Sequence, residues 1–129
     1  MEDLKSRIDI EEIIRLFYQK VRADEKLGFI FDDIAKVDWE AHLPVMYDFW
    51  EFTVLGTGAF TRNAMTPHFH LNEKIKLTPE HFNRWLELFF ETIDALYAGR
   101  NAENMKTRAK NIAGLMAHKL NDLNSLRII

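Results

Sequence analysis

Histidine is the residue type in this chain best suited to binding a metal, and the sequence contains five histidines. They are His42, His68, His70, His81 and His118. No pair has the i, i+4 spacing around a helical acid that is typical of zinc proteases. The residue three positions before a histidine is never an acid, so the Glu-x-x-His pattern of a diiron bundle is absent. The spacing of the histidines by itself therefore identifies no metal site.

Other catalytic arrangements have little support. The chain contains no cysteine, which excludes disulfides, cysteine nucleophiles, zinc–thiolate sites and iron–sulfur clusters. The two serines, Ser6 and Ser125, lie near the ends of the chain and outside any nucleophile-elbow context. No pair of carboxylates is singled out for acid–base work. We therefore assign no catalytic residue.

Aromatic side chains are frequent, with ten Phe, three Trp and three Tyr in 129 residues. Such side chains fill a core, and they also line pockets for large flat ligands. A hydrophobic pocket with one imidazole is what haem iron requires, and a bound diatomic ligand needs hydrogen-bond donors on the opposite side. Tyr18, His42 and Trp85 each carry a donor at the edge of an apolar helical face. Packing in a core is the alternative interpretation of all three.

Apolar residues at helical spacing predict the elements that must position these side chains. The first helix is expected over about residues 9–22, with Asp9 as its N-cap. Gly28 lies where this pattern breaks, and Phe29-Ile30-Phe31 begins a short apolar element. Tyr18 is therefore placed on the first helix.

A proline shapes the segment that contains His42. A proline inside a helix removes one backbone hydrogen bond and clashes with the preceding turn, and Pro44 follows a helix start at Asp38. We therefore expect an irregular turn over residues 39–42 and a regular helix over residues 43–55. Gly56 is expected to end that helix.

Two further helices are expected in the C-terminal half. Thr78 and Pro79, followed by an acid, predict the start of a helix that stops at Gly99. Asn101 is expected to cap the last helix. No segment has the pattern of a strand, so the predicted fold class is all-α, with residues 1–129 forming one domain.

Between residues 56 and 76 the helical periodicity disappears. About twenty residues without a clear element is long for a compact domain, and such loops are often functional. This segment holds Pro67, His68 and His70, and it is where we expect the chemistry.

The charge pattern bears on partners and location. The net charge is −3 and no stretch is strongly basic, which argues against binding to nucleic acid. The first residues are charged and lack the apolar run of a signal peptide, and the longest apolar runs are too short to span a membrane. We therefore expect a cytoplasmic protein that binds neither nucleic acid nor a membrane.

The order and spacing of the aromatic and histidine residues resemble the third group of truncated haemoglobins. The match runs from about Ile13 to Leu115. The residues that carry it are Phe17-Tyr18, Phe31, Trp39-Glu40-Ala41-His42, Phe49-Trp50, His68 and His81-Phe82-Asn83-Arg84-Trp85-Leu86. No one of these motifs is decisive, and the resemblance lies in their combination.

This resemblance implies a globin-like two-over-two helical sandwich around haem b. It also implies that the helix that normally bears the iron ligand is reduced largely to a loop, which accounts for the irregular segment before Thr78. His68 matches the protein ligand of the iron, and Tyr18, His42 and Trp85 match the distal polar positions. The resemblance further implies that the haem pocket includes Phe31, His42, Met46, His68, Leu71, Phe82 and Trp85. Trp39 and Trp50 are interpreted as core or helix-packing residues.

Two residues next to His68, the expected iron ligand, affect its assignment. Pro67 directly precedes His68 and fixes its own φ, which sets the entry angle of the loop. His70 lies two residues beyond His68, and in an extended loop residues two apart point the same way. His70 is therefore the competing iron ligand, and His68 is preferred.

The function that follows from the resemblance is binding of oxygen, nitric oxide or carbon monoxide at haem iron. One alternative is redox chemistry at the haem, as a nitric oxide dioxygenase or a peroxidase served by a separate reductase, although ligand binding is favoured over turnover. A different class of protein would be a haemless helical interaction module, whose apolar faces pack only on each other or on a partner.

Overall fold

The computed structural model describes residues 1–58 and 77–128, with side chains described up to residue 119. Its elements, in chain order, are the helix α1 (Arg7–Ala23), the π-helical segment η1 (Ile30–Ile34), the helix α2 (Trp39–Trp50), the π-helical segment η2 (Glu51–Leu55) and the helices α4 (Pro79–Leu96) and α5 (Arg100–Ile128). No strand occurs among the described residues, in agreement with the predicted all-α class.

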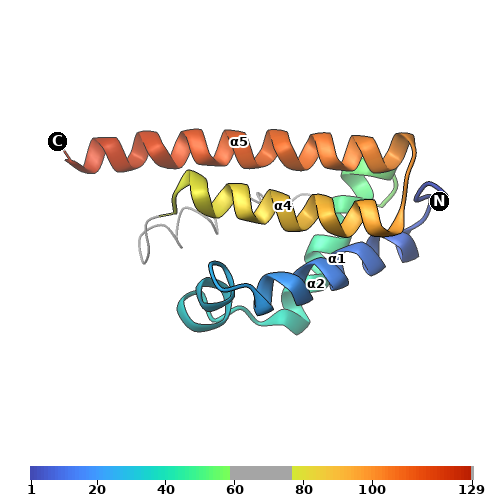
Figure 1. The fold of residues 1–129 in the computed structure, drawn as a ribbon, viewed down its shortest axis with the longest axis horizontal. Coiled ribbons are helices and arrows are strands. Elements are labelled where there is room, and N and C mark those ends of the chain that lie inside the picture. The colour runs from blue at the N-terminus through green and yellow to red at the C-terminus, as the bar shows by residue number, and fades with distance from the viewer. Residues whose placement is uncertain (59–76, 129) are drawn as a thin grey trace.

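The helices form two stacked pairs (Figure 1). One pair is α4 and α5, which run antiparallel as a hairpin. The other pair is α1 and α2; α1 packs against α4, and α2 leads into η2, which contacts α5. The chain termini lie at opposite ends of the molecule, because the long α5 extends past the start of α4. This is the two-over-two arrangement that the sequence predicts.

α1 begins earlier than predicted. Its N-cap is Ser6, so the expected capping role of Asp9 is wrong. Asp9 lies in the first turn, where its carboxylate accepts hydrogen bonds from the backbone N–H of Lys5 and from the hydroxyl of Tyr97. The apolar face of α1 is buried as predicted, and it consists of Ile10, Ile13, Ile14, Phe17 and Val21.

The structure corrects the predicted start of α2. Asp38 is the N-cap, and its carboxylate accepts from the backbone N–H of Ala41. The backbone N–H of His42 donates to the Asp38 carbonyl at 2.8 Å, so residues 39–42 form a regular first turn. Pro44 lies inside the helix and is exposed. A proline removes one backbone hydrogen bond, but on the exposed side of a helix water can bond to the freed carbonyl. The cap at Asp38 therefore starts a regular helix in spite of Pro44.

The prediction of a regular helix over residues 43–55 is also wrong at the C-terminal end of that range. After Trp50 the backbone changes to the π-helical η2. Gly56 ends this segment as predicted, with φ of 73° in the left-handed region that glycine adopts without strain.

α4 begins as predicted and ends earlier. Thr78 is its N-cap and Pro79 its first residue. The helix stops at Leu96 and not at Gly99, and Tyr97 is extended. The Tyr97 hydroxyl donates to carboxylates of α1, including that of Glu12 at 2.7 Å. This tertiary contact accounts for the early end, which helical periodicity could not predict.

The cap of α5 comes from the other end of the chain. The carboxylate of Asp3 accepts from the backbone N–H of Asn101 at 2.8 Å and of Ala102 at 3.0 Å. The predicted cap, Asn101, instead donates from its side chain to the carbonyl of Leu4. The prediction for Asn101 is therefore wrong, because a residue remote in sequence supplies the acceptor.

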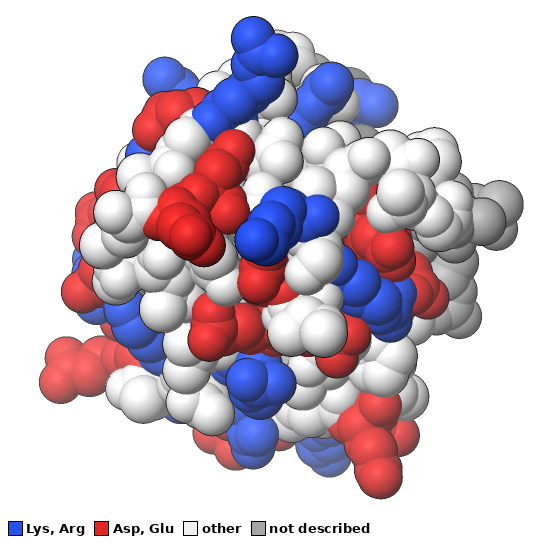
Figure 2. All heavy atoms as spheres, turned by 90° about the vertical axis from the view of Figure 1, so that its right-hand side faces the viewer, with Lys and Arg blue, Asp and Glu red and all other residues white. Residues whose placement is uncertain are grey.

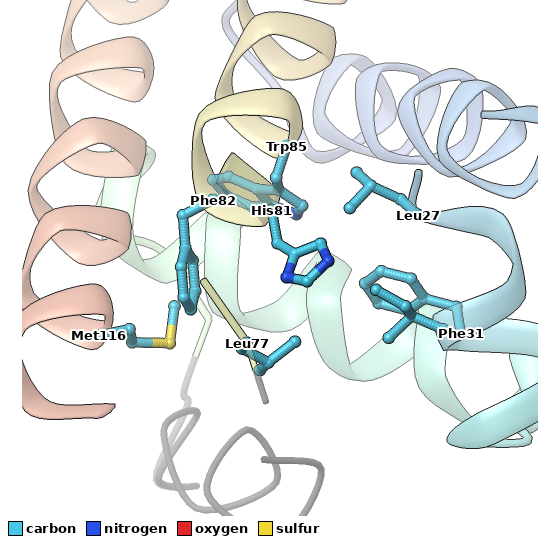
Figure 3. Close-up of a pocket in the computed structure, with 8 residues that line it drawn as sticks. Leu27, Phe31, Leu77, His81, Phe82, Trp85 and Met116 are labelled. Atoms are coloured by element: carbon cyan, nitrogen blue, oxygen red, sulfur yellow. The ribbon is translucent and has the colours of Figure 1, made fainter. Parts of the chain in front are cut away.

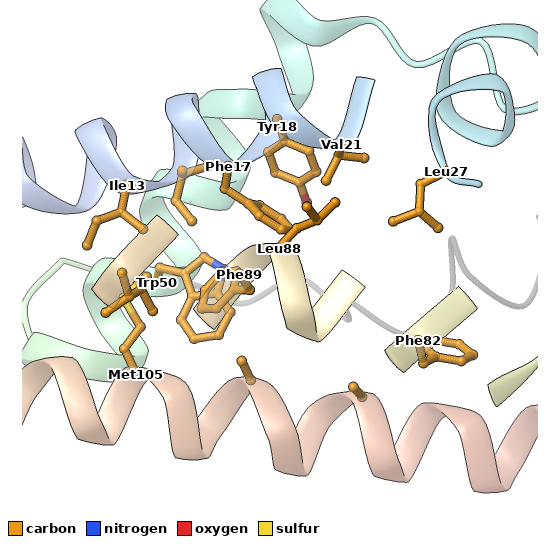
Figure 4. Packing of buried hydrophobic residues seen from close by; sticks show 14 of the residues in the cluster. Ile13, Phe17, Tyr18, Val21, Leu27, Trp50, Phe82, Leu88, Phe89 and Met105 are labelled. Carbon is orange, nitrogen blue, oxygen red and sulfur yellow. The ribbon is translucent and has the colours of Figure 1, made fainter. Parts of the chain in front are cut away.

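The core lies where the two helix pairs meet (Figure 4). Phe17 of α1, Phe89 of α4 and Met105 of α5 are fully buried there. Burying a side chain of this size contributes roughly 1.5–3 kcal/mol relative to leaving it exposed. Trp50 packs on the same cluster and is 3% exposed, which confirms its interpretation as a core residue.

Charged side chains of both signs are intermixed over the end of the molecule that holds the N-terminus (Figure 2). Neither sign gathers into a broad patch on this face. In the part of the chain that the structure describes, no helix is long and apolar enough to cross a membrane.

The turn between α1 and η1 is held against α4 by Asp24. Its carboxylate accepts from the backbone N–H groups of Lys26 and Leu27. The same carboxylate accepts from Nε of Arg84 on α4 at 2.7 Å, and the Asp24 side chain is only 6% exposed. At Gly28 the backbone passes close to α1, since a Cβ there would lie 2.4 Å from the carbonyl oxygen of Arg22. This turn therefore requires glycine.

We expect Gly28→Ala to lower the free energy of unfolding by about 1–3 kcal/mol, because the added methyl group collides with backbone atoms that cannot yield freely. Urea unfolding followed by circular dichroism measures the change.

Gly114→Ala is the matched control. Gly114 lies exposed on α5, and a Cβ there would have no atom within 4 Å. Alanine in an exposed helix is worth about 0.5–1 kcal/mol over glycine, so this variant should be more stable than the parent. Equal stability of the two variants would contradict the close approach at Gly28.

Candidate functional site

An apolar pocket opens between the start of α4, the turn after α1 and the middle of α5 (Figure 3). Its volume is about 40 Å³, and it is partly open to solvent. The residues that line it are Leu27, Ile30, Phe31, Leu77, His81, Phe82, Trp85 and Met116. Seven of these eight side chains are apolar or aromatic, so the lining has the chemistry of a site for a hydrophobic ligand, although the space described holds little more than a water molecule.

Three of the residues expected to bind the cofactor lie in this lining: Phe31, Phe82 and Trp85. The expected ligand His68, its competitor His70 and the pocket residue Leu71 lie outside the described residues. Five lining residues were not predicted. Met116 belongs to the apolar stripe of the last helix, but helical spacing indicates only that a residue is buried and not what it faces.

Tyr18 adjoins two residues of the pocket lining, Phe31 and Trp85. It is 7% exposed, and the indole N–H of Trp85 hydrogen-bonds to its hydroxyl. Its ring is 6.1 Å from that of Phe31, centroid to centroid. Burial raises the pKa of the Tyr18 phenol above its usual range, and the hydrogen bond from Trp85 offsets this only in part. The hydroxyl is therefore held in its protonated, donating form.

His42 joins the same cluster from α2. Its ring lies 5.6 Å from that of Tyr18, in an edge-to-face arrangement, and its Nε2 atom is buried. The structure thus brings the three predicted distal residues, Tyr18, His42 and Trp85, into one neighbourhood. Met46, one turn further along α2, is partly buried against the core. His42 and Met46 do not line the described part of the pocket, so their contact with a cofactor stays a prediction.

Trp39 is a member of this cluster that the sequence placed only in the core. Its ring is 5.1 Å from that of Tyr18 and 5.7 Å from that of His42. Its indole N–H donates to Asp32 at 2.8 Å, and the guanidinium of Arg22 lies 5.0 Å from the ring centre. The hydrogen bond from Trp39, with the help of Arg22, lowers the pKa of Asp32. Trp39 thus packs on Tyr18 and His42 and is held by a hydrogen bond to Asp32, which forms an ion pair with Arg22.

Among the described lining residues, His81 carries the one imidazole. It lies in the first turn of α4, and its Nδ1 accepts from the backbone N–H of Thr78 at 3.0 Å. The ring occupies the middle of the pocket, between Phe82 and Phe31 (Figure 3). Its role in capping α4 follows from the Thr-x-x-polar spacing of a capping box, but its exposure to a pocket does not.

The chemistry of this site fits the expected haem. Its lining offers aromatic and aliphatic surface to a macrocycle, and the donor Trp85 lies in that lining with Tyr18 next to it. Within the described residues no group of three His, Cys, Asp or Glu side chains is placed to hold a free metal ion.

Comparisons with known proteins point the same way. No family model matches the chain. The chain is 30% identical over 107 residues to the group 3 truncated hemoglobin ctb of Campylobacter jejuni, an alignment that covers 81% of this chain and 82% of that protein. The crystal structure of group III truncated hemoglobin from Campylobacter jejuni superposes with a TM-score of 0.79 at 28% identity, over 93% of this chain and 95% of that one.

The burial of Tyr18 predicts a loss of stability at high pH. Below the unfolded pKa of about 10 both states keep the phenol proton. Above it the unfolded chain releases the proton while the folded chain retains it, because the folded pKa is raised. Stability therefore falls as pH rises, by up to about 1.4 kcal/mol per pH unit for this group.

Urea unfolding of the parent and of Tyr18→Phe between pH 8 and 11 measures this slope. We expect a shallower decline in the variant. Trp50→Phe, a change in the same aromatic core without an ionisable group, should keep the parent's slope. Parallel slopes for the parent and Tyr18→Phe would show that this phenol does not titrate as inferred.

Proposed function

The chain belongs to the group III truncated haemoglobins, and from this premise we propose that it binds haem b and holds a diatomic gas at the iron. Family membership supports the haem-binding role. The gas, the haem type and the residues in contact with them are our proposal. Bound haem would supply an iron atom with one coordination position for the protein and one for the gas.

We assign the protein ligand of the iron to His68. The assignment rests on the position of His68 in the sequence, within the segment that separates η2 from α4. His81 does not compete for this role in the observed arrangement. Its Nδ1 is engaged by the Thr78 N–H, so its neutral ring carries a proton on Nε2 and offers no lone pair to a metal.

The observation that supports gas binding best is the convergence of Tyr18 and His42 with Trp85, which lines the apolar pocket. The Trp85 indole lowers the pKa of Tyr18, as a donor to the Tyr18 oxygen does, and such a donor leaves the Tyr18 O–H available to donate in turn. We infer that Tyr18 donates to the bound gas and that Trp85 orients Tyr18. A donor of this kind stabilises a negatively polarised ligand and slows its release.

The assignment of His68 is tested by His68→Ala. We expect the variant to lose most of its haem, or to keep an iron site that added imidazole rescues, because the axial bond is removed. Absorption spectra of the haem-reconstituted protein, with and without imidazole, measure this. His70→Ala is the matched control and should retain a parent-like spectrum. Haem loss in His70→Ala with a normal spectrum in His68→Ala would reverse the assignment.

The donor role of Tyr18 is tested by oxygen dissociation from Tyr18→Phe and Trp85→Phe. A hydrogen bond to a partly charged acceptor is worth roughly 1.5–3 kcal/mol, so Tyr18→Phe should speed dissociation about ten- to a hundredfold. Trp85→Phe should change the rate in the same direction and by less, because Trp85 acts through Tyr18. Stopped-flow mixing with a competing gas measures both rates.

Two matched variants control for loss of a phenol and of an indole elsewhere. The Tyr97 hydroxyl bonds to Asp9 and Glu12, away from the pocket, and the Trp50 ring packs on Phe89 at 5.0 Å. Tyr97→Phe and Trp50→Phe should leave the dissociation rate unchanged. Unchanged rates in Tyr18→Phe and Trp85→Phe as well would mean that both side chains serve packing alone.

A further inference from the structure

The polar groups of the pocket lining are few, and one of them has no role in the function proposed so far. Among the described lining residues only His81 and Trp85 carry a polar side-chain atom, and the Trp85 N–H is directed to Tyr18. The other lining residues can offer a ligand only apolar surface. Any polar group of a ligand at the α4 end of this pocket would therefore meet His81.

The tautomer of His81 follows from the cap of α4. The Thr78 backbone N–H can only donate, so the Nδ1 atom 3.0 Å from it must be the nitrogen with the lone pair. The Thr78 hydroxyl lies 3.2 Å from the same Nδ1. A neutral imidazole with a lone pair on Nδ1 carries its proton on Nε2. The capping contact thus turns His81 into a donor at Nε2.

The surroundings of His81 are compatible with an anionic partner. No Asp or Glu side chain is among the described lining residues. The adjacent acid, Glu80, is exposed and forms an ion pair with Lys26 from the turn after α1, so its charge is offset by a cation. A carboxylate brought to the Nε2 side of His81 would meet a donor with no unneutralised acid beside it in the lining.

We propose that His81 donates a hydrogen bond from Nε2 to a carboxylate of the bound tetrapyrrole. This inference rests on the proposed function, because haem b is the flat ligand that carries carboxylates on an otherwise apolar ring. His81 then has two structural tasks. Through Nδ1 it caps α4, and through Nε2 it positions the cofactor by one of its acid groups. His81 is a positioning residue and takes no part in gas binding.

The proposal is tested by the rate at which haem leaves the protein. The parent and His81→Leu are each loaded with iron protoporphyrin IX or with its dimethyl ester, in which both carboxylates are neutral. Loss of the Soret band to an excess of a haem-scavenging apoprotein gives the rates. We expect His81→Leu to release iron protoporphyrin IX about tenfold faster or more, and to change the release of the ester much less.

Two further variants separate donation from packing and capping. His81→Gln keeps a side chain that can cap the Thr78 N–H and can also donate, so it should release both haems at nearly the parent's rates. Phe82→Leu shrinks an apolar wall residue and should speed the release of both haems by the same factor. Equal acceleration of both haems in His81→Leu would overturn the proposal and leave haem binding intact. A parent chain that takes up neither haem would instead overturn the proposed function.

Discussion

The packing of Phe17 on α1 against α4 is the contact on which the rest of the structure depends. The Phe17 ring meets Phe89 at 4.9 Å and Trp85 at 5.4 Å, edge-to-face in both cases. Phe17 and Phe89 are fully buried, and aromatic pairs of this geometry contribute free energy beyond their buried area. Because Tyr18 follows Phe17 in the chain, the same crossing sets the Tyr18 hydroxyl beside the Trp85 indole. One core contact thus builds the candidate distal site.

Three aspartates hold the ends of the elements around this crossing. Asp3 caps α5, Asp24 joins the turn after α1 to α4, and Asp32 fixes the Trp39 indole. Each aspartate bonds to a segment that the helical periodicity of the sequence does not connect to its own. Asp24 also holds the loop that carries Leu27 to the pocket. The apolar faces therefore decide which helices stack, and these acids decide how the connecting turns meet the site.

The site has few polar groups. Tyr18 and His42 lie beside the pocket, and Trp85 and His81, one helical turn apart on α4, both lie in its lining. In the proposed function one set of donors acts on a small ligand, while His81 orients the larger group that holds it. In a truncated haemoglobin this arrangement matches a cofactor that is polar only at its carboxylates and its metal.

The sequence by itself determined the helical class, the Thr78 start of α4 and the Gly56 stop after η2, because apolar spacing and end signals are local properties. It also named Tyr18, His42 and Trp85 through their resemblance to a family. Tertiary structure decided other features. Asp3 replaced Asn101 as a cap, and His81 turned out to face the pocket that it borders. The cap of α5 comes from the other end of the chain, and the pocket that His81 faces is built from η1, α4 and α5, so no local pattern could encode either outcome. The cap at Asp38 is a local signal that the interpretation of Pro44 wrongly overrode.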